Sequence, residues 1–551
     1  MKKIFLPIIY LLAHTALHAQ FNASLESNNQ YYVDDAKIKL AETEAKDRLR
    51  SNTYLTMTYK YKQFTVGAQL ESYEPKALLN YYPGFKDVNL GTYYVNYNNE
   101  KGLDVTLGHF YEQFGSGLAL RTWEDRQLGI ANSLVGARVK YSIADNLVNI
   151  KALYGKQRIG MGFDFSNASI AAIDTEFQLA KTVGSDQFES NLGMSFVNKH
   201  EALDPNFVNA PADVNTYGIR LNNEYKDFYL NAEYLYKTKD VIKMATVVDP
   251  TNVYSGNAMN LAFGFAKKGF AFNGTLRRLE NFNIYSDREM VGNQYNQALL
   301  NYTPALTKQY DYSLANIYVY QSQPQLTFFP QRKAGEIGSQ FDLYYQFKKG
   351  SVLGGKYGTD IAFNFANWYG LKGKYRIYED YNTVETKTFA LGERYYSDFN
   401  VDVRKRFSST WNTALVYIYQ DYNTDRIQET SGRVFATTAV WDNIFKINKN
   451  SLKVELQHQW ADSSYRNWAA GLTEFNFKKN WSVFVSDMYN YDNEEVEKQM
   501  HYYTFGAVFR KNSTRVQASY GRQRGGLLCV GGVCRMVPEN TGFTLNINTT
   551  F

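Results

Sequence analysis

The sequence predicts an all-β fold, a single transmembrane antiparallel up-and-down β-barrel. Apolar and polar residues alternate in runs of about ten residues, the length at which a tilted strand crosses a hydrocarbon core. The connections between these runs alternate between very short turns and long polar loops. The 551-residue chain holds 46 Tyr and 36 Phe, yet its mean hydropathy of -0.45 excludes a polytopic helical membrane protein.

The first element is a predicted signal peptide over residues 1–19. Lys2 and Lys3 precede an apolar stretch from Ile4 to Leu12, and the small residue Ala19 stands at the expected cleavage point. We therefore expect export through a cleaved signal peptide. Because no linker-like composition divides the rest of the chain, residues 20–551 are expected to form one barrel, without room for an N-terminal plug domain.

The order of the connections predicts how the barrel is placed. Tight polar turns, such as Lys60–Gln63 and Asn98–Gly102, alternate with long connections such as Tyr32–Ser51. In outer-membrane barrels the short turns are periplasmic and the long loops are extracellular. Pairing the runs predicts about 24 strands, in a range of roughly 22 to 26. The stretch Asn281–Ala334 is either a long external loop or another strand pair, and we expect partial order there because structureless loops of this length are rare.

Aromatic residues gather near the strand ends, where a bilayer would place them in interfacial girdles. They are Trp411, Tyr417, Tyr419, Trp460, Trp468, Trp481, Tyr489 and Tyr491. The last run places Phe543, Leu545, Ile547 and Phe551 on one face of a strand. This aromatic-ended run resembles the signal read by the machinery that inserts outer-membrane barrels. The predicted location is thus the outer membrane of a Gram-negative cell, in contact with lipid and lipopolysaccharide.

The only two cysteines, Cys529 and Cys534, flank the sequence Val-Gly-Gly-Val. Two central glycines suit a two-residue hairpin turn, which would place the cysteines opposite each other and allow a disulfide in an exported protein. A metal pair or redox dithiol lacks further ligands and the C-x-x-C spacing. Arg522, Arg524 and Arg535 flank the hairpin, where they either bind lipopolysaccharide phosphates or solvate the base of the loop.

The sequence gives little support for an enzyme. His109, His458 and His501 share the parity of lipid-facing residues, which leaves His200 as the one candidate in the exported chain. No nucleophile-elbow, metalloprotease or phosphate-loop motif stands in a suitable context, and no cofactor or metal is expected. A net charge of +6 without a basic run also excludes nucleic acid as an expected partner.

The segment after the strand that ends at Phe110 is the candidate constriction loop. It leaves the strand through Gly115 and Gly117 and then presents both charge signs beside a tryptophan. One interpretation is a loop that folds into the lumen, with opposed charges setting a transverse field. The other is an external loop held by its own ion pairs. The candidate residues are Glu112, Arg121, Trp123, Glu124, Asp125 and Arg126.

Two motifs carry a resemblance to a known group of proteins. The run Phe-Tyr-Glu-Gln-Phe-Gly-Ser-Gly at residues 110–117, followed by Leu-Ala-Leu-Arg, resembles a segment of outer-membrane β-barrel proteins of Bacteroidota that have no assigned function. The Cys-Val-Gly-Gly-Val-Cys-Arg hairpin at residues 529–535 is similar too. The resemblance implies a fold and a location, but no catalytic residue and no substrate.

The function expected first is a porin-like channel, passive or substrate-selective, because a wide barrel needs water or a plug in its interior. The polar parity of the strands would line the lumen, with Asp104, Thr106, Glu112, Asn400, Asp402, Arg404, Glu455 and Gln457. The alternative is a non-enzymatic scaffold or surface-interaction component of an outer-membrane secretion or assembly complex. That alternative requires a partner protein on the long loops.

Overall fold

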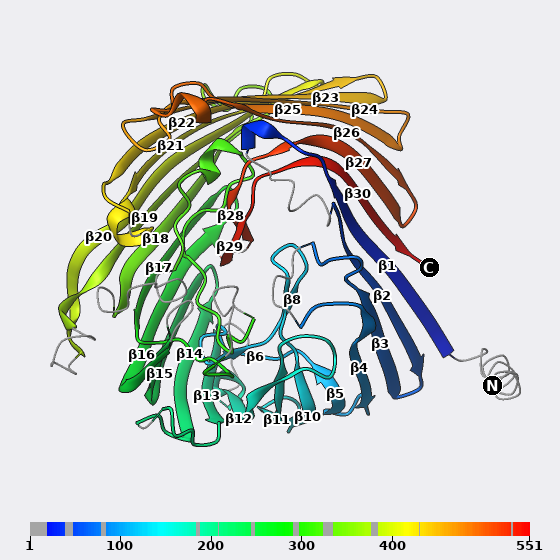
Figure 1. Cartoon of the computed structure of the whole chain (residues 1–551). Helices are drawn as coiled ribbons and strands as arrows, with labels where there is room; N and C mark the ends of the chain where they lie inside the picture. Colours follow the sequence, from blue (N-terminus) through cyan, green and yellow to red (C-terminus); the bar gives the residue numbers. More distant parts are fainter. Residues whose placement is uncertain are drawn as a thin grey trace, which may run out of the picture.

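The structure, a computed structural model, describes residues 19–38, 48–78, 84–182, 188–207, 209–243, 248–289, 297–322, 334–375, 384–428, 430–530 and 533–551. These residues form a closed antiparallel barrel of 24 strands (Figure 1), the number that the sequence predicts. The predicted signal peptide lies outside the described residues except for Ala19, with which the first strand begins.

The barrel strands follow one another around the wall, each beside its neighbour in the chain. The first twelve are β1 (Ala19–Tyr32), β2 (Leu49–Tyr61), β3 (Phe64–Ser72), β4 (Val88–Asn98), β5 (Leu103–Phe110), β10 (Leu134–Ile143), β11 (Val148–Arg158), β12 (Phe165–Gln178), β13 (Phe188–His200), β14 (Asp213–Tyr225), β15 (Phe228–Lys243) and β16 (Val248–Lys267). The others are β17 (Phe270–Glu280), β18 (Gly335–Phe347), β19 (Thr359–Tyr375), β20 (Val384–Arg406), β21 (Trp411–Tyr422), β22 (Val434–Ile447), β23 (Asn450–Ala461), β24 (Trp468–Phe477), β25 (Trp481–Asn490), β26 (His501–Lys511), β27 (Thr514–Gln523) and β30 (Asn540–Thr550).

Smaller elements stand outside this sheet. Three hairpins pair β6 (Gln113–Phe114) with β7 (Leu120–Arg121), β8 (Glu124–Asp125) with β9 (Ile130–Ala131), and β28 (Gly526–Val530) with β29 (Val533–Val537). The helical turns are η1 (Ala36–Ile38), α2 (Leu179–Thr182), η4 (Leu314–Asn316), α3 (Thr424–Ile427) and η7 (Val496–Lys498). In the described part of the chain, no helix is both long and apolar enough to span a membrane.

The first and last strands close the barrel. Leu25 of β1 stands opposite Leu55 of β2 on one side and Thr549 of β30 on the other. In β30 the alternation separates the two faces, since Phe543 is 57% exposed on the outer face while its neighbour Thr544 belongs to the inner parity. Leu545, Ile547 and Phe551 share the outer side. Their role as an insertion signal stays a prediction.

Short turns and long connections lie at opposite ends of the barrel, as the sequence predicts. The β10–β11 turn needs only the residues between Ile143 and Val148, and Ala144, Asp145 and Asn146 all adopt positive φ there. Both described ends of the chain lie at the short-turn end, because Ala19 pairs with Tyr61 and Thr550 with Ser24. The longest connections, at residues 33–48, 73–87, 111–133, 281–334 and 524–539, therefore lie at the other end.

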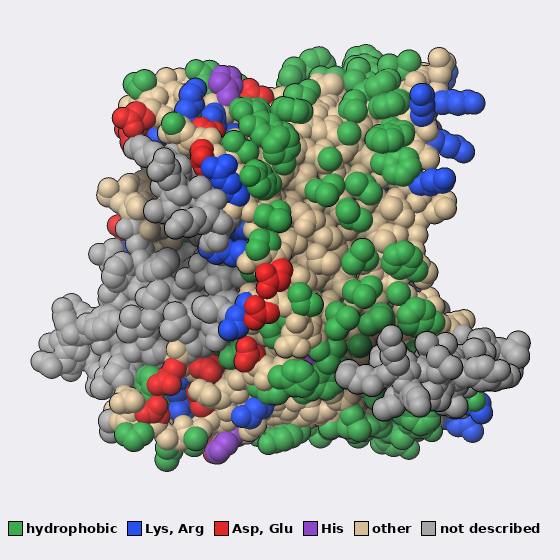
Figure 2. All heavy atoms as spheres, turned by 45° about the vertical axis from the view of Figure 1, so that its right-hand side comes forward, with side chains coloured by type: hydrophobic (Ala, Val, Ile, Leu, Met, Phe, Trp, Pro, Cys, Tyr) green, Lys and Arg blue, Asp and Glu red, His purple; other side chains and the backbone are tan. Residues whose placement is uncertain are grey.

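The outer wall carries large apolar side chains. In Figure 2 hydrophobic and uncharged side chains cover the right-hand part of the face, while Lys, Arg, Asp and Glu run down its left-hand part and project at its right edge. Trp460, Trp481, Tyr417 and Tyr419 are all exposed on this face. Trp481 begins β25 and Trp460 lies one residue before the end of β23, as the predicted girdles require, whereas Tyr417 lies in the middle of β21. Trp468 is a correction: it is 2% exposed and faces the lumen, because it pairs with Gln459 and Asn490 of the inner parity.

Candidate functional site

Three connections at the long-loop end turn into the barrel and fill part of its lumen (Figure 1). We name them loop A (residues 111–133, between β5 and β10), loop B (281–334, between β17 and β18) and loop C (524–539, between β27 and β30). Of loop B, the structure describes residues 281–289, 297–322 and 334. These loops and the wall that they touch form the candidate functional site.

Loop A is anchored by an apolar core against the inner wall. Phe114 and Leu120 are fully buried in one cluster with Leu134 of β10 and Ile170 of β12. The chain reverses between β6 and β7 through Gly115 and Gly117, whose φ angles of 51° and 93° favour glycine. This core holds the start of loop A against β10–β13 and leaves its charged half to cross the lumen.

Glu112 stands at the base of loop A in a cluster of cations. Its side chain is 3% exposed, and its carboxylate oxygens lie 2.9 Å from Lys140 Nζ, 3.2 Å from Lys151 Nζ and 3.5 Å from Arg138 Nη1. Arg138 also pairs with Asp104 at 3.2 Å, which confirms that the predicted parity of Asp104 faces the lumen. A buried carboxylate needs such partners, so Glu112 fixes loop A to β10 and β11.

Arg126 ties the far part of loop A to a different section of the wall. Its guanidinium contacts Glu124 Oε1 at 3.1 Å, Glu26 Oε2 of β1 at 2.7 Å and Gln69 Oε1 of β3 at 2.9 Å. Loop A therefore spans from β10–β13 to β1–β3. Of the two interpretations of this segment, the external loop is wrong, because its ion pairs reach the inner wall.

The sequence predicts that Arg121 and Arg126 oppose Glu124 and Asp125. Among these four side chains, the described structure pairs Arg126 with Glu124. Arg121 makes no ion pair within the described residues, and its guanidinium carbon lies 3.8 Å from the ring centre of Tyr302 and 5.0 Å from that of Trp123. Asp125 accepts a hydrogen bond from the backbone N–H of Leu128, which closes a turn of loop A. Whether these residues constrict a solute path stays a prediction.

Loop B begins as an irregular hairpin against loop A. Leu300 N–H donates to Ile284 O at 2.8 Å, and Tyr285 and Leu299 form a β-bridge. Tyr302 N–H donates to Gly117 O at 2.9 Å, which joins loop B to loop A. The sequence offered an external loop or another strand pair for this stretch. Both are wrong for its described part, because Phe282, Ile284 and Leu300 are buried in one cluster with loop A inside the barrel.

The second half of loop B crosses to β19–β24. Lys308 Nζ donates to Asn400 Oδ1 at 2.9 Å, and Leu314 N–H donates to Gln457 Oε1 at 3.0 Å. Gln459 Nε2 returns a hydrogen bond to Leu314 O at 2.9 Å. The predicted lumen-lining residues Asn400 and Gln457 thus face the interior, as do Thr106, Asp402, Arg404 and Glu455 by their parity, and part of this lining is covered by the chain itself.

Aromatic rings give loop B its other attachment. Tyr320 stacks on Trp368 of β19 at 5.9 Å and on Tyr396 of β20 at 5.2 Å between ring centres. The Trp368 indole N–H donates to Leu306 O at 3.0 Å. Sequence reasoning missed these contacts; the Tyr- and Gln-rich composition of residues 281–334 is the signal that could have pointed to them.

Loop C ends in the predicted cysteine hairpin, which lies inside the barrel (Figure 1). Cys529 stands opposite Cys534 and Val530 opposite Val533, so the predicted register is confirmed. The side chain of Cys529 lies outside the described residues, and the disulfide stays a prediction. Val533 is buried in a cluster with Leu128 and Ile130 of loop A. All three loops therefore meet within the lumen.

The arginines beside loop C do not share one role. Arg522 Nη2 pairs with Asp35 at 2.7 Å, and both side chains are 10% exposed. This corrects both readings of Arg522, because a buried, paired arginine neither solvates the loop base nor reaches out to a phosphate. The Arg524 guanidinium lies against aromatic rings, and the side chain of Arg535 is outside the described residues.

The histidines occupy separate places. His109 is a correction, because it is buried instead of facing lipid: its ring nitrogens lie 2.9 Å from Ser133 Oγ and 3.1 Å from Gly162 O. The ring of His458 contacts Tyr491, while His501 pairs with Asp487 and His200 with Asp213. Within the described ranges, no three His, Cys, Asp or Glu side chains gather as metal ligands.

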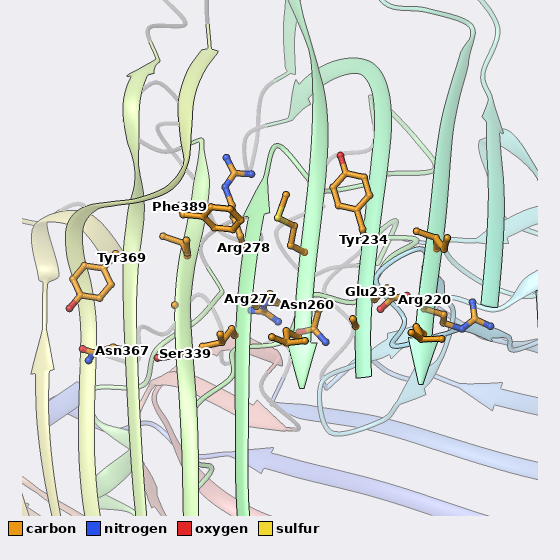
Figure 3. Close-up of a pocket in the computed structure, with 18 of the residues that line it drawn as sticks. Arg220, Glu233, Tyr234, Asn260, Arg277, Arg278, Ser339, Asn367, Tyr369 and Phe389 are labelled. Atoms are coloured by element: carbon orange, nitrogen blue, oxygen red, sulfur yellow. The ribbon is translucent and has the colours of Figure 1, made fainter. Parts of the chain in front are cut away.

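A cavity of about 880 Å³ lies along the wall from β13 to β20 (Figure 3). Its apolar lining includes Ile219, Tyr234, Leu276 and Phe389, which are all exposed large hydrophobic side chains. Arg220 and Glu233 of the opposite parity point into the lumen, since Arg220 pairs with Asp174 and Glu233 accepts a hydrogen bond from Ser116 of loop A. This cavity therefore belongs to the outer wall and is separate from the filled lumen.

Comparison with known proteins identifies a family without an assigned activity. The model described as "Family of unknown function (DUF6029)" matches residues 1–551. Among curated proteins, no sequence matches this chain.

Several solved structures are similar in fold. The siderophore receptor PirA from Pseudomonas aeruginosa has 7% identity and a TM-score of 0.41, over 97% of this chain and 80% of that one. The copper transporter OprC has 8% identity and a TM-score of 0.42, over 97% and 83%. OccAB3 from Acinetobacter baumannii has 8% identity and a TM-score of 0.37, over 97% and 99%. At these low scores the likenesses carry no argument about function.

Proposed function

The chain belongs to this family of unknown function, and we propose that it is a porin-like channel of the outer membrane, made substrate-selective by its own inserted loops. The observation that carries the proposal is the crossing of the lumen by loops A and B, each bonded to two sections of a polar inner wall. Arg126 reaches Glu26 on one side, and Lys308 reaches Asn400 on another. A pore narrowed in this way would admit solutes by size and charge.

The two faces of the wall support a membrane location. The outer face presents apolar side chains such as Leu107, Ile219 and Leu415, which suit lipid contact. The inner face presents Asp104, Arg138 and Gln457, which need water or polar partners. We propose that the long-loop end faces the outside of a Gram-negative cell, in contact with lipopolysaccharide, and the short-turn end faces the periplasm.

Biogenesis follows from the same proposal. The chain would be exported by a signal peptide over residues 1–19 and inserted through recognition of Phe543, Leu545, Ile547 and Phe551 by the barrel-insertion machinery. A Bacteroidota origin rests on the resemblance of residues 110–121 and 529–535 to proteins of that group. We propose a non-enzymatic role without a cofactor and without nucleic acid as a partner.

Conductance in planar bilayers tests the channel. The wild type is compared with a variant in which residues 114–131 of loop A are replaced by a short Gly-Ser turn. We expect small discrete conductance steps from the wild type and steps several-fold larger from the variant, because the lumen widens where loop A is removed. The matched control shortens the turn at residues 348–358 at the opposite end, and its conductance should equal that of the wild type.

If neither the folded wild type nor the loop A variant gives conductance steps, the channel proposal is overturned. That result would favour the alternative, a scaffold or surface-interaction component of an outer-membrane complex. The dense filling of the lumen by loops A, B and C is the observation that favours this alternative. Purification in a mild detergent tests it, since a scaffold should retain a stoichiometric partner that a channel does not need.

A further inference from the structure

A second cavity, of about 420 Å³, opens at the long-loop end beside loop C. We call it the rim pocket. It lies among four connections, residues 33–38, 462–467, 491–500 and 524–526, together with the ends of β24, β25 and β26. Its volume is within the range of roughly 300–1,000 Å³ found for small-molecule sites. All four connections begin at the long-loop end, so the rim pocket lies at the end that the channel proposal places outside the cell.

Three aromatic rings form one side of the rim pocket. Trp468 and Tyr502 are stacked with their ring centres 6.0 Å apart, and Tyr465 completes the set. The guanidinium carbon of Arg524 lies 5.6 Å from the ring centre of Tyr465 and 5.8 Å from that of Trp468. Arg524 makes no ion pair within the described residues. The rings therefore hold a guanidinium whose donors are not committed to a carboxylate.

The charged side chains of the rim pocket balance. Three are cationic and three are anionic, namely Lys37, Lys498 and Arg524 with Glu495, Glu497 and Glu539. One pair is already made, since Lys498 Nζ donates to Glu495 Oε1 at 2.6 Å. Glu539 accepts from the Tyr502 hydroxyl at 2.7 Å and keeps its other oxygen for a further donor. Such a lining gives no net preference for an ion of either sign, but it offers donors and acceptors side by side.

We propose that the rim pocket binds a neutral carbohydrate of the size of a small oligosaccharide. A sugar ring has C–H faces that pack on aromatic rings and hydroxyl groups that both donate and accept hydrogen bonds. The rings of Tyr465 and Tyr502 can pack against the C–H faces of a sugar. Arg524 can donate hydrogen bonds to its hydroxyl groups, and Glu539 can accept hydrogen bonds from them. A simple anion or cation would use only half of the charged groups and would leave the other half facing a like charge.

The rim pocket also adjoins the lumen. Tyr318 of loop B lies 6.3 Å from Tyr465 between ring centres, and its hydroxyl donates to Ser463 O at 3.5 Å. Loop B thus supports the connection 462–467 that carries Tyr465. Sugar binding here does not depend on the channel proposal, but if the barrel conducts, the ligand would sit next to one of the loops that fills the pore.

Saturation-transfer difference NMR tests the proposal, because it detects weak binding to a large protein. The folded full chain is kept in lauryldimethylamine oxide, since a maltoside detergent would itself compete. The probes are maltose, cellobiose and N,N′-diacetylchitobiose, with citrate as a charged comparison. We expect transfer to the C–H protons of at least one disaccharide and affinity at least tenfold lower for Arg524→Ala. Tyr465→Leu should weaken binding in the same direction and leaves every charge in place.

The matched control is Arg466→Ala. Arg466 pairs with exposed Glu494 at 2.8 Å on the same rim but does not line the rim pocket, so binding should be unchanged. The heat-modified shift of the barrel on gels confirms that each variant is folded. Absence of transfer to all three disaccharides, transfer that survives both Arg524→Ala and Tyr465→Leu, or binding of citrate alone would each overturn the proposal.

Discussion

Loops A and B fill the same lumen but are attached by different forces. Loop A reaches the wall through ion pairs, those of Glu112 with Lys140 and of Arg126 with Glu26. Loop B reaches it through stacked rings, such as Tyr320 on Trp368, and through amide bonds such as that of Gln457 to Leu314. The partly exposed pair of Arg126 with Glu26 is screened by salt and costs little to break. Packed rings, the apolar core at Phe114 and Leu120, and the buried carboxylate of Glu112 are lost only at a high cost. The part of loop A around Arg126 is thus the segment that can leave its place in the lumen first.

The largest expected effect comes from the anchor of loop B. Trp368→Ala removes a fully buried indole together with its hydrogen bond to Leu306 O. The free energy of unfolding, measured in urea, should fall by about 3–5 kcal/mol. The control is Trp460→Ala, on the exposed outer wall, which should cost clearly less. Equal losses for the two variants would contradict the role of Trp368 as an internal anchor.

A smaller effect is expected at the base of loop A. Glu112→Gln leaves three cations without their carboxylate, but Lys140 and Lys151 are partly exposed and can be solvated. The free energy of unfolding should therefore fall by about 1–3 kcal/mol. Hydrogen exchange should rise in residues 112–126 and stay constant in residues 305–320. Glu494→Gln, in an exposed pair with Arg466, is the control and should change stability by less than about 1 kcal/mol.

A change of salt concentration tests the difference between the attachments of loops A and B without a mutation. Raising NaCl from about 0.1 M to 1 M shortens the Debye length from roughly 10 Å to 3 Å. The Arg126 contacts to Glu26 and Glu124 should weaken, so hydrogen exchange around Arg126 should increase while exchange around Leu314 in loop B should not. A rise of equal size in both loops would mean that their attachments do not differ in kind.

The smallest effect is expected in loop C. If Cys529 and Cys534 are bridged, the loop closed by the bond is short, and Cys534→Ser should cost about 2 kcal/mol or less. The mass of the intact protein after alkylation gives the test: two alkyl groups should be added only after reduction. Alkylation without reduction would show two free thiols and remove the covalent constraint from loop C.

The alternation of apolar and polar residues was sufficient to predict the strands of the barrel wall. In β30 the order Phe543, Thr544, Leu545 fixes which side chains point outward, because successive residues of a strand face opposite ways. The same rule, applied to the charged segment after Phe110, placed Glu112 in the lumen. It failed at His109, since parity gives the direction of a side chain but not what covers it, and Gly162 lies over that ring.

The content of the lumen could not be predicted in the same way. Loop B has no regular period, and its position depends on contacts with residues far along the chain, such as Tyr320 with Trp368 and Leu314 with Gln457. Such pairings are a property of the closed barrel and not of any window of sequence. The rim pocket was missed for the same reason, because Ile38, Trp468 and Arg524 meet only after the wall has closed.

The seam between β1 and β30 has a consequence for how the molecule is made. Asn29 Nδ2 donates to Leu545 O across a separation of 516 residues, so this contact closes almost the longest loop that the chain can form. Contacts of high sequence separation slow folding, and the two strands have unpaired edges until they meet. These edges would recruit strands from other chains during that interval. The cell must therefore shield the edges of β1 and β30 until these two strands pair and close the barrel.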